Sequence, residues 1–186
     1  MSVRRIVTGH DADGRAVVLS DGAPPRVQGF GGGRGTVFHE LWATRETPAP
    51  IEAGADEPEE GAVSLPPPAN GTRIRIVDFP PEDDEAEVSA EEARALFAET
   101  GAAEASRHVG AGTRHAFMHR TESIDYGIVL EGEITLILDV GETIVRTGDI
   151  VIQRGTNHGW ANRSGVPARV CFVLIDGRFA PELADI

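Results

Sequence analysis

Two histidines and one aspartate form the pattern in this sequence with the clearest chemical meaning. His119 and Asp125 flank a short turn, so they lie at the end of one expected strand and the start of the next. His158 lies between Gly155 and Gly159, in a turn that a series of hairpins can return to the same end of a barrel. Two imidazoles and a carboxylate can bind a divalent metal and leave coordination positions open. The pattern makes His119, Asp125 and His158 candidate metal ligands, although a chain of this length offers many such sets.

His115 is a further candidate on the same stretch of chain. In the expected strand Arg114–His119 it has the same parity as Phe117 and His119, so the three side chains would share one face. If that face is the inner one, His115 could supply another ligand or act as a general base. A structural position, or one at the rim, is the alternative.

Four more side chains near these positions are candidates for contact with a substrate. Arg120 and Arg154 lie beside the site residues in the sequence, and a guanidinium can hold a carboxylate through two parallel hydrogen bonds. Surface salt bridges are the alternative for both. Tyr126, as a catalytic group, and Trp160, as a binding group, could line an apolar pocket, although aromatic residues also fill barrel cores.

The elements that must position these residues are mostly short strands. Apolar and β-branched runs alternate with glycine-containing turns at intervals of roughly 8–12 residues, which is typical of a sandwich or barrel. We expect strands at Arg4–Thr8, Ala16–Ser20, Thr36–Ala43, Thr72–Phe79, Arg114–His119, Asp125–Leu130, Ile134–Leu138, Thr143–Arg146, Asp149–Gln153 and Ala168–Ile175. The prediction is an all-β fold, an antiparallel barrel with added N-terminal strands.

One helix is expected between the strands, after residue 88. Ser89 is a good N-cap, Glu92 is placed to complete a capping box, and Gly101 would end the helix. The apolar residues recur at helical spacing, so one face should pack on the sheet. These residues are Ala93, Leu96 and Phe97.

Composition excludes several functional classes. The chain of 186 residues has a net charge of −13, and all 17 of its basic residues are arginines. Nucleic-acid binding needs a basic surface, and Schiff-base chemistry needs a lysine, so neither is expected. The single cysteine excludes an intramolecular disulfide. No apolar run is long enough to span a membrane, and we expect a cytoplasmic protein.

At this point two segments resemble a known family, the cupins. Residues 119–132 resemble the first cupin motif, H-x-H-x3-E-x6-G, and residues 148–162 resemble the second. The tail of the second motif, G-x2-H-x3-N, is matched by Gly155, His158 and Asn162. The resemblance covers about residues 105–176. It implies a jelly-roll-like β-barrel whose motif residues hold Fe, Mn, Ni, Zn or Cu.

The resemblance also implies roles for single residues. His119 takes the place of the first histidine ligand, His158 that of the last, and Asp125 that of the glutamate. Thr121 stands where the family has its second histidine, and Gln153 where the second motif has a proline. Because Asp is one methylene shorter than Glu, Asp125 could instead orient a water or a ligand histidine. The hydroxyl of Thr121 could hold a water or a substrate oxygen.

The leading functional hypothesis is a metal-dependent enzyme for a small oxygenated or carboxylated metabolite. It would be a dioxygenase-like oxidoreductase or a lyase, such as a decarboxylase or dehydratase, with iron favoured over zinc, manganese and nickel. A metal-free isomerase or cyclase and a non-catalytic small-molecule-binding protein are the alternatives.

The chain divides into two expected parts. Residues 1–104 would supply N-terminal strands, an acidic, proline-rich loop (residues 48–71) and the helix that packs on the barrel. Residues 105–186 would form the barrel core with both motifs. The family resemblance and the need to protect strand edges suggest a homodimer.

Overall fold

Strands make up most of the part of the chain that the structure describes. The computed structural model describes residues 2–30, 35–54, 63–82, 88–100, 102, 105 and 113–184. The elements are β1 (Arg5–His10), β2 (Ala16–Gly22), β3 (Arg26–Phe30), β4 (Thr36–Thr44), β5 (Thr72–Phe79), α1 (Ala90–Glu99), β6 (Ser123–Glu131), β7 (Glu133–Leu138), β8 (Glu142–Arg146), β9 (Ile150–Arg154), β10 (His158–Ala161), β11 (Ala168–Asp176) and α2 (Pro181–Ala184). Of the expected loop at 48–71, residues 55–62 lie outside these ranges.

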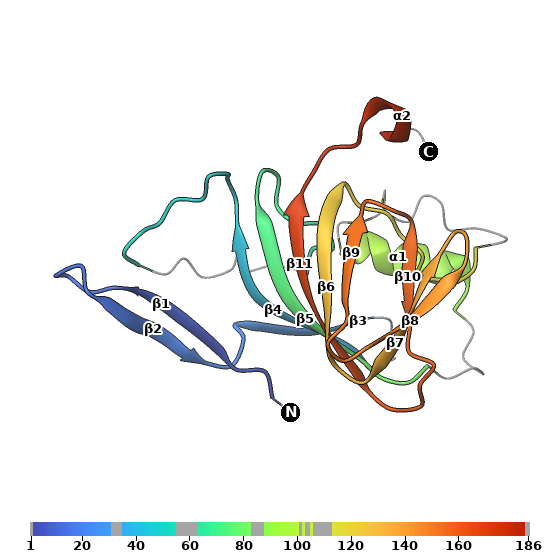
Figure 1. Ribbon diagram of the computed structural model, residues 1–186, viewed down its shortest axis with the longest axis horizontal. Helices are drawn as coiled ribbons and strands as arrows, with labels where there is room; N and C mark the ends of the chain where they lie inside the picture. The colour runs from blue at the N-terminus through green and yellow to red at the C-terminus, as the bar shows by residue number, and fades with distance from the viewer. Residues whose placement is uncertain are drawn as a thin grey trace.

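Two antiparallel sheets form the body of the molecule (Figure 1). The larger has the strand order β3-β4-β5-β11-β6-β9, and the smaller has the order β10-β7-β8. Val129 and Val170 of the larger sheet pack in one buried cluster with Ile134 and Val145 of the smaller. The fold is therefore all-β and jelly-roll-like, as predicted. Strands from both expected parts of the chain meet in the larger sheet, where β5 pairs with β11.

Alternation along β6 decides which side chains enter the barrel. Ser123, Asp125 and Val129 are buried, whereas Ile124 and Tyr126 between them are exposed. Successive side chains of a strand point to opposite faces, so β6 presents its odd-numbered residues to the interior. Asp125 therefore faces the interior and Tyr126 faces away from it.

The helix α1 begins where the sequence predicts. The Ser89 side chain accepts a hydrogen bond from the backbone N–H of Glu92, and the Glu92 carboxylate accepts one from Ser89 N–H, which completes the capping box. Ala93 and Phe97 are buried on the packing face, as expected. The proposed end at Gly101 lies outside the described residues. Among the helices that the structure describes, none has the length and apolar character needed to cross a bilayer.

The hairpin of β1 and β2 projects away from the barrel (Figure 1). The two strands pair with each other in a sheet of their own. A side-chain hydrogen bond from Arg5 to Leu41 O and a backbone bond from His10 to Ala53 O connect the hairpin to neighbouring segments. Ile6 and Val18 remain more than half exposed. The added N-terminal strands thus exist, and this pair contributes nothing to the barrel sheets.

The expected strand at Arg114–His119 is wrong. Residues 113–118 form turns, in which the Met118 N–H bonds to His115 O, and only His119 forms a β-bridge, with His158. The segment turns inward because Met118 is buried and Gly159 leaves room beside it. A Cβ on Gly159 would lie 3.3 Å from both Met118 Sδ and His115 Nδ1. The strands β3 and β10 were not anticipated from the sequence.

Candidate functional site

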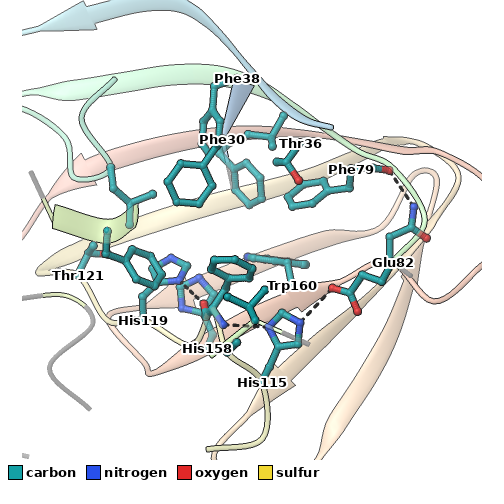
Figure 2. A pocket seen from close by; sticks show the side chains of 18 of the residues that line it. Phe30, Thr36, Phe38, Phe79, Glu82, His115, His119, Thr121, His158 and Trp160 are labelled. Atoms are coloured by element: carbon teal, nitrogen blue, oxygen red, sulfur yellow. Dashed lines mark hydrogen bonds and ion pairs between the residues drawn. The ribbon is translucent and has the colours of Figure 1, made fainter. Parts of the chain in front are cut away.

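A cavity of about 720 Å³ lies inside the barrel (Figure 2). Its walls are largely aromatic, and the polar groups gather at a few points, as is usual in small-molecule sites. The aromatic lining comprises Phe30, Phe38, Phe79, Phe97, Phe117, Trp160 and Phe172. The polar lining includes Arg75, Glu82, His115, His119, Thr121, Asp125 and His158.

His119 and His158 lie side by side in the cavity wall, with ring centroids 4.3 Å apart. The β-bridge between them sets this distance, because each backbone N–H bonds to the other residue's carbonyl. His119 Nδ1 lies 3.0 Å from Phe117 O, and His158 Nδ1 lies 3.0 Å from Thr156 O. A carbonyl only accepts, so both Nδ1 atoms must carry the proton. Each neutral ring therefore has its lone pair on Nε2.

Both imidazoles are held in the neutral form. Burial, and then the neighbouring His119, lower the pKa of His158 to about 3. Burial also lowers the pKa of His119, although its hydrogen bond to Phe117 O acts in the opposite direction. Neutral imidazole with a free Nε2 is the form that binds a metal ion.

Asp125 is a buried carboxyl on the same cavity wall. Burial raises its pKa to about 6, although a hydrogen bond from Ser123 and the positive charge of Arg75 act in the opposite direction. Its Oδ1 atom has no hydrogen-bond partner in the described part of the chain. Thr121 lies close by, with its Oγ1 2.8 Å from Ser123 Oγ. A carboxyl with this pKa can exchange a proton with a bound molecule near neutral pH.

The predicted three-residue metal set is not formed among the described residues. Within them, no three His, Cys, Asp or Glu side chains converge closely enough to hold one ion. Asp125 lies on β6 and has a short side chain. Thr121 occupies the position at which the resemblance would place a second histidine ligand. The donor chemistry fits a divalent metal through the two Nε2 atoms of His119 and His158, with Asp125 outside that pair.

Arg75 is a site residue that the sequence reading missed. It lies on β5, is only 2% exposed and lines the cavity. Arg75 has the same parity as Val77, which is buried, so this parity faces the interior. That shared parity was the available signal.

Several other predicted site residues lie on the cavity wall. His115 pairs with Glu82, with 3.0 Å between His115 Nε2 and Glu82 Oε1 (Figure 2). It reaches the cavity from a turn rather than from a strand face. Trp160 packs edge to face against Phe172, with ring centroids 5.4 Å apart. Thr121 is buried beside Asp125 on the same wall.

Three predicted site residues point elsewhere, and their assignments need correction. Tyr126 and Arg154 are exposed, because strand alternation turns them to the outer face of β6 and β9. Arg120 donates from Nε to Gly155 O at 2.9 Å and from Nη2 to Leu183 O at 2.7 Å. Its guanidinium also stacks on Phe179. Arg120 thus fastens the C-terminal segment, and none of the three lines the cavity.

Comparison with known proteins places the chain in a family. The Cupin domain family model matches residues 105–175. Phomopsin biosynthesis cluster protein C' of Diaporthe leptostromiformis is 34% identical over 183 residues, which cover 94% of this chain and 78% of that protein. The cupin-domain-containing oxidoreductase virC of Hypocrea virens is 32% identical over 179 residues, covering 92% and 75%. The chain therefore belongs to the cupin superfamily.

A solved structure is also similar in outline. The Cnp3 cupin domain of Schizosaccharomyces pombe matches with a TM-score of 0.44 and 10% identity, covering 95% of this chain and 89% of that one.

Proposed function

We propose that this chain is an oxidoreductase of small-molecule biosynthesis, with a divalent metal, iron favoured, held by His119 and His158. The observation that carries the proposal is the pair of neutral imidazoles in the wall of an aromatic cavity, each with Nδ1 bonded to a carbonyl. Relatives named as cupin-domain-containing oxidoreductases or biosynthesis cluster proteins support this class of activity.

Each group in the cavity would have a separate task. Iron bound to the two Nε2 atoms would supply oxidation chemistry with dioxygen at open coordination positions. The bonds from His119 to Phe117 O and from His158 to Thr156 O hold the rings in orientation. The aromatic walls exclude water and bind an apolar substrate body. Asp125 would hold or release a proton at Oδ1, the oxygen that has no partner among the described residues.

Metal analysis of the purified protein tests this proposal. Mass spectrometry of anaerobically prepared protein should find about one ion per chain, and His119→Gln or His158→Gln should lower that content at least about ten-fold. His10→Gln is the matched control, because His10 is exposed at the end of β1. Wild-type protein that stays metal-free after reconstitution with iron, manganese, nickel or zinc would refute the metal assignment.

A metal-free acid–base enzyme, such as an isomerase or cyclase, is the second candidate. It is favoured by the pKa of Asp125, about 6, together with the lack of a three-residue metal set among the described side chains. Turnover that persists in excess chelator, yet is lost in Asp125→Asn, would select this alternative. Ligand binding without any turnover would instead indicate a binding protein.

We also propose that two copies pair through the outer face of the larger sheet. On this face Tyr126 lies opposite Ile152, and Ile128 lies opposite Ile150. Ile150 and Ile152 are each more than half exposed, and Tyr126 is exposed as well. An apolar sheet face of this kind normally packs against another layer of structure. A second copy of the chain would supply it.

A further inference from the structure

The buried arginine of β5 gives the cavity a charged anchor. We propose that Arg75 binds a carboxylate of the substrate, so the molecule that enters the cavity is an aromatic or similarly apolar carboxylic acid. The inference rests on the proposed small-molecule role, and it adds the chemical class of the ligand and the residue that selects it.

Arg75 has hydrogen-bonding capacity that the described part of the chain leaves unused. Its Nη2 donates to Ser64 O, but neither Nε nor Nη1 has a hydrogen-bond partner among the residues that the structure describes. Nε lies 3.1 Å from Glu40 Oε1, within ion-pair distance, although the angle there is not that of a hydrogen bond. Unmade hydrogen bonds of a buried charged group are costly, so a purely structural arginine normally uses its donors. Among the described residues Nη1 is left without a partner, and we assign it to a bound molecule.

The nearest acid does not satisfy this positive charge by itself. Glu40 also accepts a hydrogen bond from Arg73, with 3.0 Å between Arg73 Nη1 and Glu40 Oε2. Two arginines thus share one buried carboxylate, and of the two only Arg75 lines the cavity. Burial lowers the pKa of Arg75 to about 10, whereas the charges of Glu40 and Asp125 act in the opposite direction. A substrate carboxylate would accept a hydrogen bond from Arg75 Nη1 and pair with the charge of the guanidinium.

The rest of the cavity fits the apolar part of such an acid. Phe38 packs against the Arg75 guanidinium, with 5.5 Å between the guanidinium carbon and the ring centroid. Phe30 and Phe79 continue the aromatic wall (Figure 2). The volume of about 720 Å³ lies within the range of pockets that bind drug-sized molecules. The cavity therefore combines a buried arginine that can bind a carboxylate with a wide apolar wall.

Calorimetry with a matched pair of probes tests the anchor without relying on turnover. The probes are 2-naphthoate and its neutral isostere 2-naphthamide, titrated at pH 7.5 in the presence of chelator so that no metal contributes. Wild-type protein should bind the acid at least about ten-fold more tightly than the amide, as expected for a buried charge-assisted pair. Equal affinities, or no naphthoate binding at millimolar concentration, would overturn the proposal.

Variants then assign the preference to Arg75. Arg75→Gln leaves Glu40 paired with Arg73, so no buried charge loses its only partner, and it should abolish the preference for the acid while affinity for the amide persists. Arg75→Lys keeps the charge but loses the two-pronged geometry and should retain part of the preference. Arg154→Gln, on the exposed face of β9, is the matched control and should behave as wild type. Thermal unfolding checks that each variant is folded.

The outcomes separate this inference from the proposed function. A preference for naphthoate that survives in Arg75→Gln but disappears in His119→Gln would assign the carboxylate to the imidazoles and overturn the role of Arg75. A failed metal analysis, in contrast, leaves the calorimetric result unaffected, because chelator is present throughout.

Discussion

Among single residues, Asp125 combines a raised pKa with a place in the cavity wall, and both follow from burial on β6. Its carboxyl has a pKa of about 6 in the folded protein and about 3.8 in an exposed chain, so the folded state binds the proton more tightly. Ionised Asp125 therefore destabilises the fold, and its contribution to the free energy of unfolding should decrease as the pH rises from about 4 to 6.

Asp125→Asn should remove this pH dependence. The variant should be more stable than wild type at pH 7.5, by up to about 1.4 kcal/mol for each unit of pKa shift, and should lose that advantage at pH 4. Urea denaturation at the two pH values measures the difference. Asp13→Asn, at an exposed turn position, should show no such change. If the stability of Asp125→Asn depends on pH in the same way as that of wild type, burial does not raise the pKa of Asp125.

Turnover should fall about 100-fold in Asp125→Asn if Asp125 transfers a proton.

Among the elements, β4, β5 and β11 are joined outside the barrel by a cluster around Asp78. Arg169 of β11 lies opposite Asp78 in the register and binds it through Nε at 2.5 Å and Nη2 at 2.8 Å. His39 Nε2 of β4 lies 2.8 Å from the same carboxylate. Burial alone would raise the pKa of Asp78, but the hydrogen bonds from Arg169 and His39 outweigh it and lower the pKa.

Asp78 should therefore stabilise the sheet above its ordinary pKa of 3.8 and stop doing so as the pH falls further. Arg169→Met should lower the free energy of unfolding at pH 7 by about 1 kcal/mol, a value reduced because Asp78 is 30% exposed in its side chain. The difference from wild type should shrink at pH 2.5, as measured by urea denaturation. Arg4→Met, which breaks an exposed pair with Asp21, should change stability less. An equal loss in both variants would contradict the role of the cluster.

Local patterns predicted the elements well, and long-range packing explains the failures. The bounds of β5 and the capping box at Ser89 agree with the structure, because period-two alternation and cap chemistry act over a few residues. The segment at Arg114–His119 also has strand-like composition. Its conformation depends on contacts with Gly159, more than forty positions away in the sequence, so composition alone could not reveal it.

The site was predictable only in part for the same reason. His119 and His158 are recognisable from their motifs, but their 4.3 Å separation depends on a bridge between distant segments. Arg75 was hidden because an arginine on a strand is normally read as facing solvent. The orientation of the strand follows instead from the buried Val77, two positions further on.

For the whole molecule, the outer face of the larger sheet raises the question of assembly. Ile152 is 55% exposed and lies opposite Tyr126, which is itself next to Val173 of β11 in the register. Burying this apolar surface would yield roughly 25 cal/mol for each Å² removed from water. We therefore expect the full chain to be a dimer at micromolar concentration, with this face at the contact.

A charge on this face should separate the copies. Ile152→Arg would place a guanidinium at the centre of the contact, next to its symmetry mate if the dimer is two-fold, so both desolvation and like-charge repulsion oppose pairing. Size-exclusion chromatography with light scattering should show the dimer mass in wild type and the monomer mass in the variant. Val140→Arg is the matched control, since Val140 is 91% exposed in the turn between β7 and β8 and should not affect assembly.

A monomeric wild type would refute the dimer. A dimeric Ile152→Arg variant would place the contact on another surface, and the projecting β1–β2 hairpin would be the next surface to alter. Ile152 points away from the cavity, so the monomeric variant should still bind 2-naphthoate, which makes assembly and ligand binding separable properties of the chain.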